Sequence, residues 1–345
     1  MRYLPIDKVT LGTYLARPIY SSSGTILLTE NFQLTESVIS RLKSLGYTGL
    51  YVEDEISKGI DIIEVVEEKM RLEASSQLET IVKNNGNLTE MLPVISNIVE
   101  SILDNKDVLI QMKQLQDFHD YTYSHCVNVG ILAVSIGIKH NFTKDELLKL
   151  GVSGVLHDIG KQSIPLEILD KPASLSETEY EVIKGHPVNG YNMLKDVLEF
   201  SSLTKAGVLQ HHERCDGSGY PRGLKNKDIN IFAKIIAIAD TYDAMTSNRS
   251  YRVAYSPEEA YEYLMGDGDN RFDLNIVRLF TQCFAVYPVG TCVELSDGTN
   301  AIVIQNYSDN PLRPLLRNIM TNEILDLKND MNCLSLCINK LSDNY

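Results

Sequence analysis

The feature that most constrains this fold is an ordered series of histidines and aspartates between residues 125 and 240. Five of the seven histidines of the chain belong to it. Its members lie on apolar faces or at the ends of segments with helical periodicity, where an unpaired polar side chain is costly. The pattern therefore predicts that several helices bring polar side chains to one site. The series consists of His125, His157, Asp158, His186, His211, His212 and Asp240.

Histidine and aspartate in this mixture are ligands for divalent metal ions. The series holds more ligands than one ion needs, which suggests two ions that share a bridging carboxylate. Two metals in one pocket are a known arrangement for hydrolysing phosphate esters. The residues alone therefore favour a metal-dependent phosphohydrolase.

Composition and charge restrict the partners. A formal net charge of −14 argues against a nucleic-acid polymer, which needs an extended basic surface. The longest apolar run is the nine residues 231–239, interrupted by Lys234, whereas a membrane span needs about 20 residues. The N-terminus also lacks the apolar core of a signal peptide. We therefore expect a cytoplasmic protein without a membrane segment.

Changes in composition and periodicity along the sequence divide the chain into four parts. Residues 1–58 are predicted to form a small α+β module, and residues 59–91 a charged helical linker. The linker is interpreted either as a connecting helix or as a coiled-coil contact between two copies of the chain. Residues 92–286 are nearly all helical in period. Residues 287–345 form a small β-rich module, with a hairpin predicted at Asp297-Gly298.

Two segments of the sequence are the most informative about the predicted site. His157 and Asp158 lie on an apolar helix, where a metal or a structural His–Asp pair would satisfy them. Gly160, two residues later, allows another backbone or a ligand to approach closely. The glycine-rich block 211–224 has local positive charge, which suits a rim over an anionic substrate, although a surface turn is the simpler alternative.

The helical region resembles the HD-GYP subfamily of the HD phosphohydrolase superfamily. The resemblance implies a mainly α fold: an all-helical, HD-type metal-dependent phosphohydrolase bundle, here with the small α+β and β modules at its ends. It also implies hydrolysis of cyclic di-GMP to pGpG, GMP or both. The matching segments are YTYSH (121–125), HDIGK (157–161), GHP (185–187), HHERCDGSGYPRGL (211–224) and IADTYDAMTSNRSYR (238–252).

The resemblance also implies roles for the series. The cofactors would be two divalent ions, iron or manganese, and Asp158 would bridge them. Asp158 and Lys161 would be the catalytic residues, with Lys161 contacting the scissile phosphate. By the motifs, one ion would be held by His125, His157, Asp158 and Asp240, and the other by His186, His211, His212 and Asp158.

The resemblance also implies which residues contact the substrate. Gly219, Tyr220 and Pro221 would border the pocket. Arg249 and Arg252 fall where members of the family place basic residues that bind phosphates or guanines.

One position departs from the family pattern. Members with three metals tend to carry a glutamate four residues before the first histidine, and this chain has Tyr121 there. We therefore expect a binuclear site. A hydroxide that bridges the two ions would attack the phosphorus in line.

Two other functions remain open. One is an HD phosphohydrolase acting on another nucleotide, such as a mixed cyclic dinucleotide. The other is a weakly catalytic interaction protein that responds to cyclic di-GMP. The resemblance suggests cyclic di-GMP and GGDEF-type synthases as partners. The linker suggests a second copy of the chain.

Overall fold

The computed structural model describes residues 1–21, 24–111, 121–169, 171, 173–247, 254–267 and 270–342. The chain divides into two compact units, each described here by itself. The helical unit covers Val65–Val108 and Asp120–Cys283. The β-rich unit combines Met1–Glu64, Leu109–His119 and Phe284–Tyr345.

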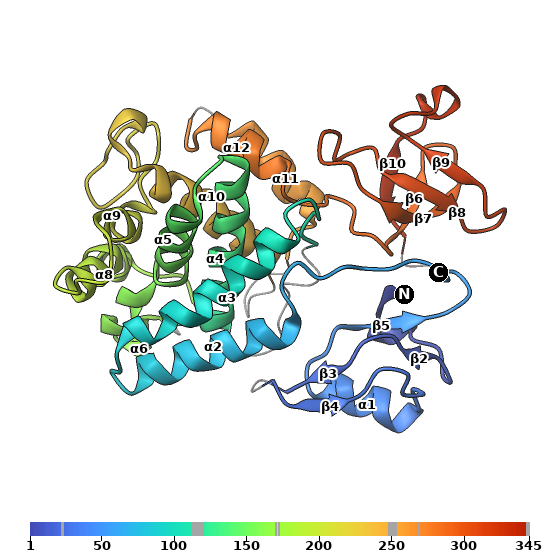
Figure 1. Cartoon of the computed structure of the whole chain (residues 1–345), viewed down its shortest axis with the longest axis horizontal. Helices are drawn as coiled ribbons and strands as arrows, with labels where there is room; N and C mark the ends of the chain where they lie inside the picture. The colour runs from blue at the N-terminus through green and yellow to red at the C-terminus, as the bar shows by residue number, and fades with distance from the viewer. Residues whose placement is uncertain are drawn as a thin grey trace. The chain divides into compact units, whose positions relative to one another are not determined.

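The helical unit contains the whole histidine–aspartate series. Figure 1 labels the longer helices of this unit. Its longer helices are α2 (Glu68–Lys83), α3 (Met91–Asp104), α4 (Tyr121–Lys139), α5 (Lys144–Val155), α8 (His186–Leu194), α9 (Ser202–Gln210), α10 (Ile231–Thr246), α11 (Pro257–Gly266) and α12 (Leu274–Thr281). Its shorter ones are η2 (Leu88–Glu90), η4 (Ile159–Ser163), α6 (Leu166–Leu169), α7 (Glu177–Ile183) and η5 (Asn226–Asp228).

Helix α4 is the centre of this unit, in contact with α2, α3, α5, α10 and α12. Its apolar stretch from Val127 to Ile136 is buried, as expected for a helix that is hydrophobic on nearly every side. Helix α5 crosses α4 closely, because a Cβ on Gly154 would lie 2.8 Å from the Cα of Gly130. This crossing sets the end of α5, and with it His157 and Asp158, beside α4.

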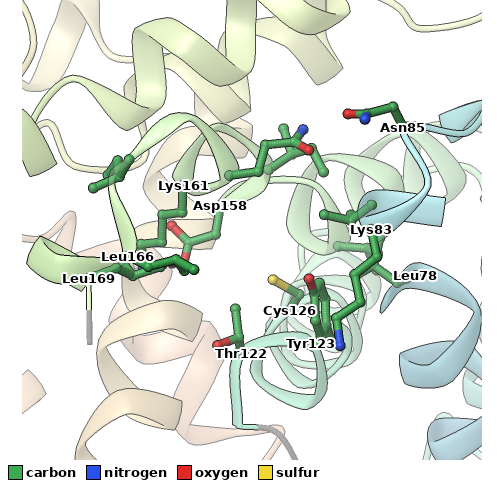
Figure 2. A pocket seen from close by; sticks show the side chains of 15 residues that line it. Leu78, Lys83, Asn85, Thr122, Tyr123, Cys126, Asp158, Lys161, Leu166 and Leu169 are labelled. Atoms are coloured by element: carbon green, nitrogen blue, oxygen red, sulfur yellow. Dashed lines mark hydrogen bonds and ion pairs between the residues drawn. The ribbon is translucent and has the colours of Figure 1, made fainter. Parts of the chain in front are cut away.

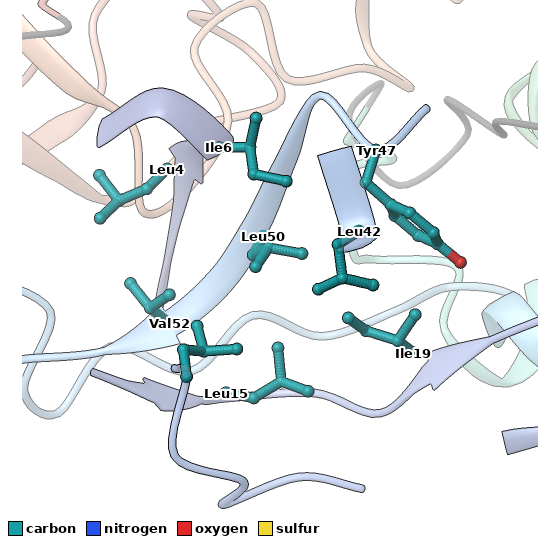
Figure 3. Packing of buried hydrophobic residues seen from close by; sticks show 9 residues of the cluster. Leu4, Ile6, Leu15, Ile19, Leu42, Tyr47, Leu50 and Val52 are labelled. Atoms are coloured by element: carbon teal, nitrogen blue, oxygen red, sulfur yellow. The ribbon is translucent and has the colours of Figure 1, made fainter. Parts of the chain in front are cut away.

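The N-terminal part of the β-rich unit is built around strand β5 (Gly49–Glu53), which pairs antiparallel with β1 (Arg2–Pro5) and β2 (Tyr14–Leu15). A separate hairpin joins β3 (Ile19–Tyr20) to β4 (Ile26–Leu28). The turn η1 (Ile6–Lys8) and helix α1 (Glu36–Ser44) complete it. Figure 3 shows the buried side chains that these elements enclose, among them Leu15, Leu42, Leu50 and Val52.

The C-terminal part of the β-rich unit is a five-stranded antiparallel sheet of order β10-β6-β7-β8-β9. The predicted hairpin at Asp297-Gly298 is confirmed, since these residues connect β6 to β7. The elements are β6 (Cys292–Leu295), β7 (Asn300–Gln305), β8 (Leu315–Asn318), β9 (Ile324–Asp326), η6 (Met331–Cys333) and β10 (Ile338–Leu341).

The two parts of the β-rich unit share one apolar cluster. Ile60 and Ile62 pack with Cys292 and Ile302, and the guanidinium of Arg317 donates hydrogen bonds to two carbonyls of the segment 56–58. A module of about 60 residues buries too little surface to be very stable alone, so sharing a core stabilises both.

The predicted fold class is confirmed: a mainly helical domain with small β-containing modules at its ends. The compact units have different boundaries from the four predicted parts. The predicted linker 59–91 is divided, because α2 packs on α3 and α4 as part of the helical unit. Within the described residues, no helix is both long and apolar enough to cross a bilayer.

Candidate metal centre

The ends of helices place most of the candidate ligands. His157 and Asp158 lie in the turn between α5 and η4, and His186 is the first residue of α8 with a proline beside it. His211 is the C-cap residue of α9. His125 and Asp240 lie within α4 and α10 instead. Most of the candidate ligands thus come from the turns at helix ends.

Three of the histidines are held by their own chain in the same way. In each, the ring Nδ1 lies within hydrogen-bond distance of the carbonyl oxygen three residues earlier. A carbonyl oxygen only accepts, so Nδ1 carries the proton, and Nε2 of the neutral ring presents a lone pair. The pairs are His157 with Gly154 at 2.7 Å, His186 with Ile183 at 2.8 Å, and His211 with Val208 at 2.7 Å.

These lone pairs converge on the carboxylate of Asp158, and its two oxygens face different histidines. Oδ2 lies 3.3 Å from Nε2 of His157 and 3.8 Å from Nε2 of His125. Oδ1 lies 3.1 Å from Nε2 of His186 and 3.9 Å from Nε2 of His211. The structure thus presents two groups of ligand atoms that share Asp158, and the atoms within each group all lie within 4.8 Å of one another. The first group is His125, His157 and Asp158. The second group is Asp158, His186, His211 and His212.

The chemistry of this donor set fits divalent cations. Nε2 of His186 and Nε2 of His211 lie 3.2 Å apart. Each of these nitrogens bears a lone pair when Nδ1 of its ring holds the proton. Within the described part of the chain, the buried Nε2 of His157 has no hydrogen-bond partner. Facing lone pairs and a buried acceptor are unfavourable unless a cation lies between them.

The protonation states of His211 and His212 also favour a metal site. Burial, followed by the neighbouring His212 and His157, holds the pKa of His211 well below its usual value. Burial likewise lowers the pKa of His212 to about 3. Both rings are therefore neutral at physiological pH, which is the form that binds metals.

His125 has an orienting partner that the sequence did not reveal. Its Nδ1 lies 2.7 Å from Oδ2 of Asp243, and the other oxygen of Asp243 accepts a hydrogen bond from the Asn128 amide at 3.1 Å. Nε2 of His125 is directed toward Asp240 Oδ1, at 3.2 Å, and toward Asp158. Carboxylates behind metal-binding histidines fix the ring and its tautomer. Asp243 lies one helical turn after Asp240, and this i, i+3 spacing was the available signal.

The carboxylates around His125 also affect its charge. Burial lowers its pKa, but hydrogen bonds with Asp240 and Asp243 outweigh burial and raise the pKa to about 9. In the absence of a cation the ring therefore holds a second proton. A divalent ion bound at Nε2 would replace that proton.

Asp158 is ionised despite its burial. Burial opposes ionisation, but the ammonium of Lys161 outweighs it and holds the pKa of Asp158 well below its usual range. Nζ of Lys161 lies 2.5 Å from Oδ2 of Asp158. Lys161 keeps 29% of its side chain exposed, so its ammonium can also reach a ligand.

Gly160 fits the turn between Asp158 and Lys161 because α8 lies against it. A Cβ at this position would be 2.0 Å from the carbonyl oxygen of His186 and 2.4 Å from the amide nitrogen of Gly190. The group that approaches closely where Gly160 lacks a side chain is therefore the backbone of α8. This contact fixes the start of α8, and with it His186, beside the HDIGK turn.

The loop that follows His212 packs back on the ligands. The ring of Tyr220 stacks on the ring of His212, with centroids 4.7 Å apart, and the Tyr220–Pro221 peptide is cis. Buried Glu213, which the sequence did not single out, accepts hydrogen bonds from the amides of Arg222 and Leu224 at 2.8 Å each. The block 211–224 is thus an ordered loop attached to the candidate metal centre.

A pocket of about 520 Å³ opens beside Asp158 and Lys161 (Figure 2). Helix α4 contributes Thr122, Tyr123 and Cys126 to it. Gly219, Tyr220 and Pro221 are not among its lining residues. Arg249, Arg252 and the side chain of Tyr121 lie outside the described residues.

Residues 94–276 match the family model described as HD domain, which is more than half of the chain. The chain belongs to the HD domain family. Its motifs place it among the HD-GYP members, so the predicted family is confirmed. Membership and the histidine–aspartate cluster together imply dependence on a divalent metal.

Several curated proteins are similar in sequence to this HD domain protein. A Pseudomonas aeruginosa protein named as a cyclic di-GMP phosphodiesterase is 34% identical over 224 residues, which cover 65% of this chain and 54% of that protein. A Thermotoga maritima protein of the same name is 35% identical over 178 residues, or 50% of this chain and 48% of that protein. A Vibrio cholerae protein named as a 3′3′-cGAMP-specific phosphodiesterase is 36% identical over 167 residues, or 48% of this chain and 37% of that protein. The chain thus matches about half or less of each relative's length.

A solved structure resembles this HD-GYP member over most of its length. It is a Bdellovibrio bacteriovorus protein described as an HDG"Y"P protein, which covers 81% of this chain and 97% of its own with a TM-score of 0.53. At 18% sequence identity the likeness concerns the fold alone.

Proposed function

We propose that this protein is a metal-dependent phosphodiesterase that hydrolyses cyclic di-GMP to pGpG, GMP or both and so lowers its cellular level. One observation carries the proposal: the two oxygens of Asp158 face two separate groups of histidines, at the edge of a pocket that also contains Lys161. The relatives named as cyclic di-GMP phosphodiesterases support the choice of substrate.

In this proposal the residues have distinct roles. His125, His157, Asp158 and Asp240 would hold one divalent ion, and His186, His211, His212 and Asp158 the other. When bound, such ions activate water near neutral pH and neutralise charge on phosphoryl oxygens.

Lys161 supplies the remaining positive charge of the proposed site. Burial lowers its pKa, but the carboxylate of Asp158 outweighs burial and raises it, so the side chain stays an ammonium. Placed beside Asp158, it would donate a hydrogen bond to a non-bridging oxygen of the scissile phosphate as negative charge builds up there. Gly219, Tyr220, Pro221, Arg249 and Arg252 remain the predicted further substrate contacts.

The decisive experiment compares metal-loaded and metal-stripped protein. We expect protein loaded anaerobically with iron or manganese to convert cyclic di-GMP to linear products, identified by chromatography and mass spectrometry. Metal-stripped protein should form none. Absence of any linear product from loaded protein would overturn the proposal.

A mixed cyclic dinucleotide is the second candidate substrate. The Vibrio cholerae relative named as 3′3′-cGAMP-specific supports it, because its identity to this chain is similar to that of the cyclic di-GMP enzymes. Side-by-side kcat/KM values for cyclic di-GMP and 3′3′-cGAMP decide between the two. Tight binding of cyclic di-GMP with negligible turnover would instead favour the interaction protein, whose partners would include GGDEF-type synthases.

A homodimer and a cytoplasmic location stay predictions.

We predict two ions per chain. The residue four positions before His125 is Tyr121 rather than a glutamate, so a carboxylate for a third ion is missing from that position. Elemental analysis of pure protein after loading and desalting should give about two equivalents of metal per chain for a two-metal site. Three tightly held ions would contradict the prediction.

A further inference from the structure

The pocket beside Asp158 and Lys161 has a second wall that the sequence did not suggest. Helix α2 and the turn after it contribute Leu78, Val82, Lys83 and Asn85 to its lining. Figure 2 shows Lys83 and Asn85 on the opposite side of the pocket from Lys161 and Asp158. A helix predicted as a linker therefore lines the pocket of the proposed active site.

The charges of the lining favour an anion. The charged side chains that line the described pocket are Lys83, Lys161 and Asp158. Lys83 forms an ion pair with Glu79 one turn earlier on α2, and 62% of its side chain is exposed. An exposed i, i+4 pair of this kind is weak, so it does not by itself hold the ammonium against Glu79. In a chain of net charge −14, two ammonium groups on facing sides of one pocket are the charged groups of its lining that can bind an anion.

The proposed substrate needs more than one site for negative charge. A cyclic dinucleotide has two phosphodiesters in one covalent ring, so while one phosphate lies at Asp158 and Lys161, the other lies elsewhere in the pocket. The rest of the lining suits the nucleobases, because much of it is apolar. A volume of about 520 Å³ is that of a small-molecule site. The apolar lining residues are Leu78, Val82, Val155, Ile159, Ile164, Leu166 and Leu169.

We infer that Lys83 binds the second phosphate of the cyclic dinucleotide, the one that is not being cleaved. The inference rests on the proposed function and deepens it. Lys83 would hold the ring in place during cleavage of the first phosphodiester without touching the reacting atoms. Its role is therefore in substrate binding, and its removal should affect KM rather than kcat.

The test separates binding from chemistry by using two substrates. For Lys83→Ala we expect the KM for cyclic di-GMP to rise about tenfold, as for loss of one charged hydrogen bond, with kcat almost unchanged. Bis(p-nitrophenyl) phosphate has a single phosphodiester, so its hydrolysis by the same loaded protein should be unaffected. Lys83→Arg keeps the positive charge and should restore most of the affinity.

Lys149→Ala is the matched control. Lys149 also forms an i, i+4 ion pair, with Asp145 on α5, and it is not a lining residue of the pocket. If Lys83→Ala and Lys149→Ala have the same KM for cyclic di-GMP, the inference is wrong while the proposed function stands. If wild-type protein cleaves bis(p-nitrophenyl) phosphate but not cyclic di-GMP, the proposed function falls and the inference with it.

Discussion

Asp158→Asn is expected to abolish both turnover and tight metal binding. The substitution keeps the size of the side chain but removes the charge that both groups of histidines face. Loss of a residue behind a ligand typically costs 10- to 100-fold, so loss of a carboxylate shared by two ions should cost at least about 1000-fold in kcat. Rates with cyclic di-GMP and the metal content of the purified variant are the measurements.

Asp145→Asn provides the comparison for this variant. Asp145 is an exposed carboxylate on α5 that pairs with Lys149, so the same chemical change there should alter neither rate nor metal content. Circular dichroism of both variants checks that the helices remain. An Asp158→Asn protein with wild-type activity and a full metal complement would refute the assignment of Asp158.

Gly160→Ala is expected to have the second largest effect. The added methyl group would lie 2.0 Å from the carbonyl oxygen of His186 and 2.4 Å from the amide of Gly190, and both neighbours are backbone atoms that cannot rotate away. The start of α8 must shift, and His186 with it. Overpacking of this kind costs about 1–3 kcal/mol of stability. A ligand displaced by about 1 Å can lower kcat about 100-fold.

The control for this variant is Gly266→Ala. Gly266 ends α11, and apart from its chain neighbours and the backbone of α11, no atom of the described residues lies within 4 Å of the position of an added Cβ. Alanine there should leave the melting temperature unchanged or raise it slightly. Thermal unfolding, metal content and kcat of the two variants are compared. Equal behaviour of both would mean that the contact between Gly160 and α8 does not position His186.

The sequence predicted the helical domain and the small modules at its ends because both depend on local patterns. Helical period and turn residues such as Asp297-Gly298 act over a few neighbouring positions. The ligand series was also visible, because histidines on apolar helices are unusual. The structure brings the seven predicted ligands to one place, and their roles as ligands stay a proposal.

Other features depend on contacts between distant segments and could not be predicted. Asp243 of α10 orients His125 of α4, and Asn128, on the same helix as His125, donates a hydrogen bond to Asp243. The spacing from Asp240 pointed to Asp243, but its contact with His125 is known only from the fold. Glu213 was included in the glycine-rich block, but its hydrogen bonds to that loop are known only from the fold. The contribution of α2 to the pocket was missed because a charged, amphipathic helix has the same pattern whether it connects domains or covers a site.

The carbonyl groups that hold His157, His186 and His211 have a consequence for how this protein acquires its metals. Each ring is oriented by its own backbone, so the ligands are already in place before an ion arrives. Loading would then consist of stripping water from the ion and displacing the second proton of His125, with little rearrangement of the chain. A ready-made set of imidazoles and carboxylates would bind both iron and manganese, and the supply of each ion in the cell would contribute to which one it contains.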